Sequence, residues 1–322
     1  MKTKNAPPPP WGYPRPLPPL SIFLLVCLCA CVGGNEAERA RTKPQEPSVG
    51  DRPPSPLSPE FKAYWYGGEA EITSFALEQE RYGELREGEA VLIFVTEPFL
   101  PGAQVKADRD HRDNVPVLKL NATKKFLTGI YPYSIMGSTF FPVHGNGHAL
   151  KSSLSVQEWC GHVYSQINNR EKFEFTSHSY FEGEADQEIL MEKAHLESEL
   201  WTRIRIDPKG LPLGSLEVIP SLEYLRLYHK EPKAYGAEAT LSQEGAVATY
   251  TLSYPDLGRK LGIRFSMDFP HTIVGWWEES PWGSGETAKT LTSRATMIKT
   301  LKTAYWKQHA NSDLGLRDSL GL

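Results

Sequence analysis

Short strand-like segments joined by turn residues run from Phe61 to the end of the chain, and they restrict its fold more than any other feature. Glu89–Glu97 is an apolar run that Pro98 stops, and Ala246–Tyr254 leads into the turn residues Pro255-Asp-Leu-Gly258. Such runs predict strands, and their short connections predict antiparallel neighbours. The sequence lacks the alternation of strands and helices that a parallel sheet requires.

We therefore expect residues 61–322 to form a mainly β globular region. A wide sheet must curl or split, so this region should be one large curved antiparallel sheet or two β-rich lobes that divide near residue 205. The segment 186–205 is rich in helix formers, acidic at its start and apolar along one face, which predicts an amphipathic helix. A short helix near Asp313–Leu320 should close the chain.

One pair of strands forms the clearest predicted hairpin. Residues 159–167 and 172–181 flank Asn168-Asn169, and asparagine tolerates the positive φ of tight turns. With these asparagines as the turn, His162 lies on an aromatic face and His178 on the opposite face. In this register the two imidazoles do not converge, and His162 is expected to be a hydrogen-bonded core residue.

Composition excludes several classes of protein. The 322 residues contain 35 Lys plus Arg against 39 Asp plus Glu, a net charge of −4, and no basic stripe is visible, so no nucleic-acid partner is expected. A hydrophobic content of 40% is too high for a disordered chain. No apolar stretch approaches the ~20 residues of a membrane-spanning helix, which excludes a polytopic membrane protein.

The first residues carry an export signal. Lys2, Lys4 and Arg15 precede an apolar run of eleven residues, Leu20–Ala30, which at ~1.5 Å per residue is too short to span a bilayer. It has the length of the hydrophobic region of a signal peptide. We expect residues 1–30 to be such a peptide.

The end of this run resembles the lipobox of bacterial lipoproteins. Leu28-Cys29-Ala30-Cys31 has an apolar residue, small residues before the cut, and a cysteine. The resemblance implies cleavage after Ala30 and acylation of Cys31 (diacylglycerol on sulfur, a third chain such as palmitate on the new amino group), enough for stable anchoring. The alternative is an ordinary signal peptide that happens to contain cysteines.

A tether follows the expected lipidation site. Fourteen of the 26 prolines lie in residues 1–60, and the segment 31–60 has almost no apolar residues to bury. It should be a disordered, solvated linker between a membrane and the globular region. The expected location is therefore the bacterial cell envelope, at the periplasmic face of the outer membrane, with the membrane as a partner through the lipid anchor.

Motifs with a defined chemistry are missing. The sequence has no Gly-x-x-x-x-Gly-Lys or Gly-x-Gly-x-x-Gly loop, no Gly-x-Ser-x-Gly, no His-Glu-x-x-His and no paired Cys-x-x-Cys. Cys160, beside Trp159, is expected to be a buried small hydrophobe rather than a nucleophile. We expect no cofactor, and no enzyme unless its catalytic residues are dispersed.

Two constellations could still carry chemistry. His144-Gly-Asn-Gly-His148 could bring two imidazoles to a metal, but we favour a surface turn and predict no metal. The second is the hairpin with its tail, where His162, His178 and Glu182 are the candidate acid/base residues. For Phe181–Asp186 we favour a strand end followed by a helix N-terminus.

Aromatic residues fall in tight local groups, namely Tyr64-Trp65-Tyr66, Tyr131-Pro-Tyr133, Phe140-Phe141, Trp276-Trp277 and Trp282. On a curved sheet, alternating aromatics could line a concave surface for an acyl chain or an apolar partner. Aromatics are also ordinary strand and core residues, and that reading is the simpler one.

Five stretches resemble a group of Bacteroidetes envelope lipoproteins often labelled septum formation inhibitor Maf. They are Glu89–Glu97, Thr128–Tyr133, Gln157–His162, Ser177–Ala185 and Leu314–Leu322. Genuine Maf proteins are cytosolic nucleotide pyrophosphatases with a Ser/Thr-x-Ser-x-x-Arg loop. That loop is missing here, so the residues do not support the label, and the resemblance implies only an envelope lipoprotein of unassigned activity.

These observations favour a non-catalytic, membrane-anchored envelope lipoprotein that binds an apolar ligand or an envelope protein through its curved sheet. The alternative is an envelope hydrolase with a His/carboxylate site around His162, His178 and Glu182. A cleft that joins these three residues would favour the enzyme, and a continuous apolar groove would favour binding. A third reading, a purely structural envelope component, would show neither.

Overall fold

The computed structural model describes residues 57–145 and 147–322. The predicted signal peptide at 1–30, Cys31 and the tether up to residue 56 lie outside this range. The described chain begins with helix α1 (Pro59–Trp65), which Ser58 caps through a 3.0 Å hydrogen bond from the backbone N–H of Phe61. Within the described residues, no helix combines the length and apolar character needed to cross a membrane.

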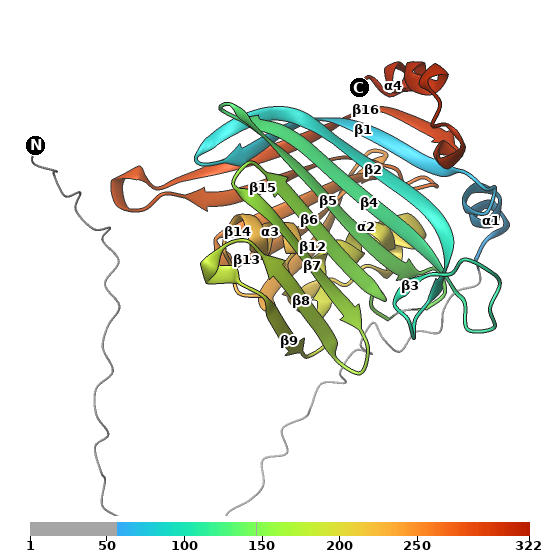
Figure 1. Cartoon of the computed structure of the whole chain (residues 1–322), viewed down its shortest axis with the longest axis horizontal. Coiled ribbons are helices and arrows are strands. Elements are labelled where there is room, and N and C mark those ends of the chain that lie inside the picture. The colour runs from blue at the N-terminus through green and yellow to red at the C-terminus, as the bar shows by residue number, and fades with distance from the viewer. Residues whose placement is uncertain (1–56, 146) are drawn as a thin grey trace, which may run out of the picture. The chain divides into compact units, whose positions relative to one another are not determined.

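One sheet contains all sixteen strands of the described residues, in the order β10-β11-β12-β13-β14-β15-β16-β1-β2-β4-β5-β6-β7-β8-β9, with β3 paired to β2 (Figure 1). This confirms the mainly β class and the single-sheet alternative, because strands on both sides of residue 205 share one sheet. The strands are β1 (Ala70–Arg81), β2 (Glu84–Leu100), β3 (Val105–Lys106), β4 (Val115–Thr128), β5 (Tyr131–Pro142), β6 (Lys151–Glu158), β7 (Gly161–Asn169), β8 (Phe173–Ser179), β9 (Gln187–Met191), β10 (His195–Leu196), β11 (Gly214–Ile219), β12 (Tyr235–Glu244), β13 (Val247–Tyr254), β14 (Arg259–Ser266), β15 (Ile273–Trp282) and β16 (Lys289–Thr303).

A short link between the two edge strands forces the sheet to curl. β9 and β10 stand at opposite ends of the strand order, yet only residues 192–194 connect them. Such a link reaches about 14 Å when fully extended. A flat sheet with this many strands, ~4.8 Å apart, would separate its edges by roughly 65 Å. The sheet must therefore bend round until its edges approach each other.

Two helices fill the space inside the curl. α2 (Glu197–Ile206) connects β10 to β11, which are the parallel pair in the described sheet, and α3 (Leu222–Leu227) follows β11. α2 packs against β4 and β5 on one side. On the other side, Trp201 of α2 meets Trp276 of β15 edge-to-face at 5.3 Å. The sheet thus encloses α2 from both sides.

The enclosed α2 carries charges on its buried surface, and each is paired. Arg205 donates to both carboxylate oxygens of Glu71 in β1, at 2.6 Å each. Near its start, Glu197 binds Arg259 of β14, which also donates to Glu278 of β15 at 2.6 Å. A buried charge is tolerated only when it is paired and hydrogen-bonded, so these contacts fix how α2 sits against the sheet.

The ion pair between Arg205 and Glu71 determines the charge state of the carboxyl. Burial by itself raises the pKa of Glu71, but the guanidinium of Arg205 more than offsets this, and the net pKa is lowered. Tyr64 of α1 adds a 2.6 Å hydrogen bond to the same carboxylate. Burial and the neighbouring Glu71 in turn raise the pKa of Tyr64. This cluster therefore joins α1, β1 and α2.

The helix predicted near 186–205 exists only in its second half. Residues 187–191 form β9 instead, pairing with β8 so that Ile189 opposes Phe175 and Met191 opposes Phe173. These apolar side chains face inward, whereas Leu190 is 71% exposed. Cross-strand packing has here overridden the helix propensity of the sequence.

The predicted hairpin is present, but the register predicted for its two strands is wrong. Tyr164 pairs with His178 and Ile167 with Phe175, because residues 170–172 form the turn. Compared with the predicted register, the pairing is shifted by an odd number of residues. Side chains expected on one face of the sheet therefore lie on the other face. His162 is therefore exposed on the outer face rather than buried among aromatics.

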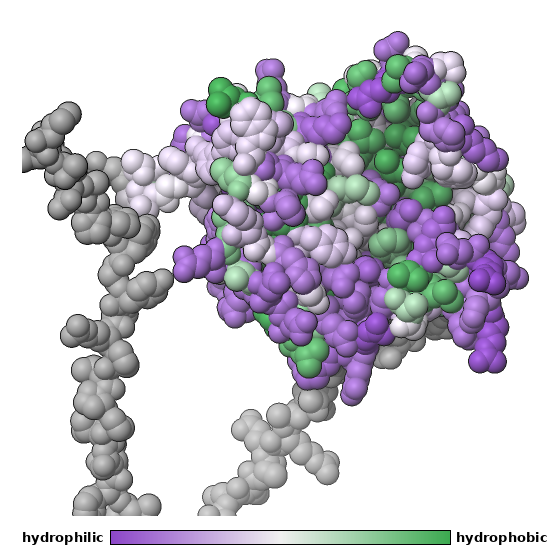
Figure 2. Space-filling view, viewed as in Figure 1, coloured by the Kyte–Doolittle hydropathy of each residue, from purple (hydrophilic) through white to green (hydrophobic). Residues whose placement is uncertain are grey.

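The predicted C-terminal helix is confirmed as α4 (Gly315–Leu320). It covers a small apolar cluster on the outside of the sheet, where Leu320 packs with Ile72 and Val95. The face shown in Figure 2 is otherwise largely hydrophilic, with hydrophobic side chains gathered beside α4. The sheet is thus apolar inside and mostly polar outside.

We expect Glu71→Gln to lower the free energy of unfolding by about 3–5 kcal/mol, because it leaves the guanidinium of Arg205 buried without a counter-charge. The double variant Glu71→Leu with Arg205→Met removes both charges and should lose less stability than the single variant. Urea denaturation of the three proteins tests this. A double variant that is less stable than Glu71→Gln would contradict it.

Candidate functional site

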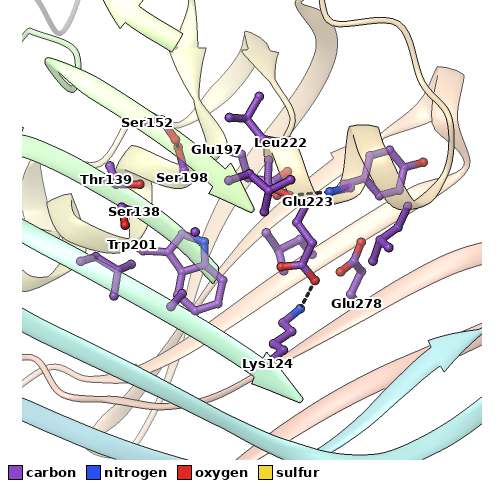
Figure 3. Close-up of a pocket in the computed structure, with 18 of the residues that line it drawn as sticks. Lys124, Ser138, Thr139, Ser152, Glu197, Ser198, Trp201, Leu222, Glu223 and Glu278 are labelled. Atoms are coloured by element: carbon purple, nitrogen blue, oxygen red, sulfur yellow. Dashed lines mark hydrogen bonds and ion pairs between the residues drawn. The ribbon is translucent and has the colours of Figure 1, made fainter. Parts of the chain in front are cut away.

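An interior cavity of about 100 Å³ lies between α2, α3 and the inner face of the sheet. Its walls come from distant parts of the chain: Leu120 of β4, Leu154 of β6, Leu261 of β14 and Trp276 of β15 all line it. Trp201 of α2 projects into this space between a group of hydroxyl side chains and a group of charged ones (Figure 3). The cavity thus has an apolar body with two polar ends.

The hydroxyl end involves Thr139 of β5, Ser152 of β6 and Ser198 of α2. The Oγ atoms of Ser152 and Ser198 lie 3.1 Å apart and share a hydrogen bond. Thr139 and Ser152 are buried at positions that face inward on their strands. Small hydroxyl side chains at these positions leave the space that larger residues would fill.

The charged end is bounded by ion pairs. The Nζ of Lys124 in β4 donates to the carboxylate of Glu223 in α3 at 2.6 Å, as the dashed line in Figure 3 shows. The two side chains are 13% and 22% exposed. This pair connects the sheet to α3 where α3 closes the cavity.

A second and larger space, the lateral groove, lies between α3 and the inner face of β7, β8 and β9, with a volume of about 580 Å³. Its wall is apolar and is formed by Val163, Phe175, Ile189, Leu222 and Leu225. Charged residues line it as well: Arg226 is buried, Glu184 is partly buried, and His229, Lys230 and Glu231 are exposed at its rim.

Two serines create the hollow in this wall. Ser165 of β7 and Ser177 of β8 are directly opposite each other and line the groove. They are only 4% and 8% exposed, so their small side chains sit inside the apolar layer without filling it. Leu222 of α3 lines both the groove and the interior cavity. α3 therefore separates the two spaces.

A cluster of charged residues at the groove joins the segment that follows β8 to α3 and to the residue His229 that comes after it. Residues 182–184 form a 3₁₀ turn, where a strand end and a helix start were expected. The carboxylate of Glu184 contacts His229 and lies 3.5 Å from Arg226. Burial works to raise the pKa of Glu184, but the hydrogen bond from His229 and the charge of Arg226 lower it overall.

The candidate acid/base residues do not form a cleft. His162 and His178 are both exposed on the outer face of the sheet, and His178 lies 3.1 Å from the exposed Asp186. Glu182 is exposed in the 3₁₀ turn. None of the three lines the interior cavity or the lateral groove.

Two further expectations need correction. Cys160 is exposed, not buried, because it lies in the turn between β6 and β7. Its backbone N–H donates to the carboxylate of Glu158, and the hydrogen bond that its thiol donates to Glu158 raises the pKa of the thiol. His148 does not sit in a simple surface turn with His144, since its imidazole contacts the buried Glu199. His144 is exposed.

The aromatic groups divide between core and surface. Trp65, Tyr133, Phe141 and Trp276 are buried inside the sheet, whereas Trp282 is 38% exposed. Of these, Trp276 lines the interior cavity. The concave face is therefore aromatic in part, while the groove depends mainly on aliphatic residues and the two serines.

Sequence reasoning missed the residues that shape both spaces. Lys124, Glu197 and Arg259 are charged residues at inward positions, and Ser165 and Ser177 are small residues at inward positions. In the sequence, the only sign of these residues is a polar side chain at a position where the pattern of the strand or helix predicts an apolar one.

No known family model matches this sequence, and no curated protein matches it. Among solved structures, it is similar to a β-barrel-like protein of the DUF1849 domain from Brucella abortus, with a TM-score of 0.43, 8% identity, and coverage of 72% of this chain and 96% of that one. It is also similar to a porin-like protein from Bacteroides uniformis, with a TM-score of 0.23, 10% identity, and coverage of 76% and 98%. Neither likeness reaches a TM-score of 0.5, and neither bears on function.

We expect Glu223→Ala to loosen α3, because it removes the ion pair with Lys124. Backbone amides of residues 222–227 should exchange with deuterium faster, while the free energy of unfolding falls by only about 1 kcal/mol. Glu231→Ala is the matched control, because its pair with Lys233 is exposed by more than half on both sides. Equal exchange rates in Glu223→Ala and the wild type would contradict the role assigned to this pair.

Proposed function

We propose that this protein is a non-catalytic binding protein of the bacterial cell envelope, anchored to a membrane through Cys31, and that its lateral groove takes an apolar ligand such as an acyl chain. The observation that carries the proposal is the groove itself. Its volume of about 580 Å³ falls within the ~300–1,000 Å³ of small-molecule sites.

The lining of the groove supports this choice of ligand. Apolar side chains from three strands and α3 would contact the body of the ligand, and burial of apolar surface would drive binding. Lys230 is exposed at the rim, where a polar end of the ligand would meet water, whereas the buried guanidinium of Arg226 lines the groove and is paired with Glu184. An apolar segment of an envelope protein would fit the same chemistry and is the other outcome of the test below.

The location rests on the sequence. The apolar run at 20–30, the lipobox-like Leu28–Cys31 and the resemblance to Bacteroidetes envelope lipoproteins all support export and acylation. The Pro-rich segment that follows would hold the globular region away from the bilayer.

The hydrolase alternative has less support. Its residues, His162, His178 and Glu182, lie on the outer surface away from both cavities. A catalytic site normally needs a concave pocket that positions the substrate and excludes water.

We expect Ser165→Phe with Ser177→Phe to fill the groove and weaken binding of a fluorescent fatty acid at least ~10-fold, because the two rings occupy the hollow between the strands. Thr176→Phe is the matched control, since residue 176 faces the opposite side of β8 and should bind like the wild type. Circular dichroism checks that each variant is folded.

Native mass spectrometry of the purified full-length protein should detect an apolar ligand in the wild type that the double serine variant lacks. Binding of the fluorescent fatty acid that is equal in the double variant and the wild type would overturn the groove proposal. A wild type that binds no apolar probe, but does bind an apolar peptide through the same residues, would assign the groove to a protein partner.

We expect Cys31→Ala to abolish labelling by a radioactive fatty acid and to move the protein from the membrane fraction to the soluble fraction, because the thiol is the acylation site. Cys160→Ala is the control, because that cysteine lies outside the leader, and it should label normally. Fatty-acid label that persists on Cys31→Ala would refute the lipid anchor and leave the groove proposal untouched.

A further inference from the structure

Three residues from separate parts of the chain meet at the start of α2, away from the two cavities. His148 lies between β5 and β6, His195 belongs to β10, and Glu199 lies in the first turn of α2. One potential ligand atom from each lies within 4.8 Å of the others. From this geometry we propose that His148, His195 and Glu199 form a binding site for a divalent transition metal, with Zn²⁺ as the best fit.

Two of the three distances between these atoms are close to those around a tetrahedral metal ion. The Nδ1 of His148 lies 3.1 Å from Oε1 of Glu199, and the Nδ1 of His195 lies 3.5 Å from the same oxygen. Ligands bonded to Zn²⁺ at ~2.0–2.1 Å in a tetrahedron stand ~3.3 Å apart. Each imidazole is therefore already placed to share one ion with this oxygen.

The nitrogen of His195 gives independent evidence for a missing partner. Its Nδ1 is buried and forms no hydrogen bond, although it lies only 3.5 Å from a carboxylate oxygen. A buried polar atom without a partner is costly and calls for an explanation. A metal ion that accepts the lone pair of this nitrogen would supply one.

The carboxylate of Glu199 is held in place to present one oxygen. Its side chain is fully buried, and its Oε2 accepts a 2.8 Å hydrogen bond from the backbone N–H of Ala149. This leaves Oε1 directed at the two imidazoles. The ring of His148 is fixed by an edge-to-face contact with Phe173 at 5.4 Å. Such surrounding contacts orient metal ligands in protein sites.

The site lies near the surface and has a charged neighbour. Both histidine side chains are 23% exposed, although Glu199 and the Nδ1 of His195 are buried. Arg203 lies 4.0 Å from Oε1 of Glu199, but another nitrogen of its guanidinium donates to the carbonyl of Gly210 at 3.1 Å. Its positive charge weakens affinity for any cation. Two nitrogen ligands and one oxygen favour Zn²⁺ over Mg²⁺ or Ca²⁺, which prefer oxygen ligands.

Metal titration of the full-length protein tests this site. After treatment with a chelator, the wild type should bind one Zn²⁺ per chain in isothermal titration calorimetry, whereas His195→Ala should bind about 100-fold more weakly. His195 is the informative position, because its Nδ1 makes no hydrogen bond that the variant would lose. If His195→Ala does not fold, His195→Gln gives the same comparison.

His178→Ala is the matched control. His178 also lies 3.1 Å from a carboxylate, that of Asp186, but both are exposed, and within residues 57–145 and 147–322 no third ligand joins them. This variant should bind Zn²⁺ like the wild type.

Two further readouts separate metal binding from a structural role. Zn²⁺ should raise the unfolding temperature of the wild type more than that of His195→Ala, because a ligand stabilises the folded state more strongly when it binds that state more tightly. Co²⁺ should give an intense visible absorption band with the wild type that His195→Ala lacks. Absence of stoichiometric binding by the wild type, or equal binding by His195→Ala, would overturn the proposal.

Discussion

The buried ion pairs of α2 are the interactions on which the rest of this structure depends. Arg205 is bound to Glu71 in β1, and Glu197 is bound to Arg259 in β14, so the two ends of one helix are attached to different strands. The helix lies inside the curled sheet, where water cannot solvate its charges, and only these positions satisfy them. A buried apolar helix could slide or rotate among equivalent packings. Paired charges remove that freedom and give the interior one arrangement.

Fixing α2 in this way leaves the remaining space to α3 and the sheet. α3 is tied to β4 by Lys124 and Glu223, and it divides the interior into the cavity beside Trp201 and the groove beside β7 to β9. Small residues at inward positions keep the two spaces from being filled: Ser152 at the cavity, and Ser165 and Ser177 at the groove. The apolar wall of the groove is therefore built by strands β7 to β9 and by α3.

Period-two patterning was sufficient to predict the fold class, because strand alternation is a local property of the sequence. The register of β7 and β8 was predicted wrongly, because the turn was placed at Asn168-Asn169 and not at residues 170–172. With the observed turn, His162 lies on the outer face of the sheet. Residues 187–191 were wrongly predicted to be helical, because the residues that they pack against, Phe173 and Phe175, belong to a different strand and cannot be inferred from local sequence. The metal-ligand cluster was missed for the same reason: His148 and Glu199 are 51 positions apart, and only long-range pairing brings them together.

The pairing of β1 with β16 places the first and last strands of the sheet next to each other in its middle. Thr73 and Thr300 are 227 positions apart and their hydroxyls are 3.0 Å apart. During folding, β1 therefore keeps one edge unpaired until the C-terminal part of the chain is available to form β16. An unpaired edge of this kind recruits other strands, and contacts this distant in sequence form slowly. Until β16 is in place, the edge of β1 is open to wrong strand pairing, a risk that the finished sheet no longer carries.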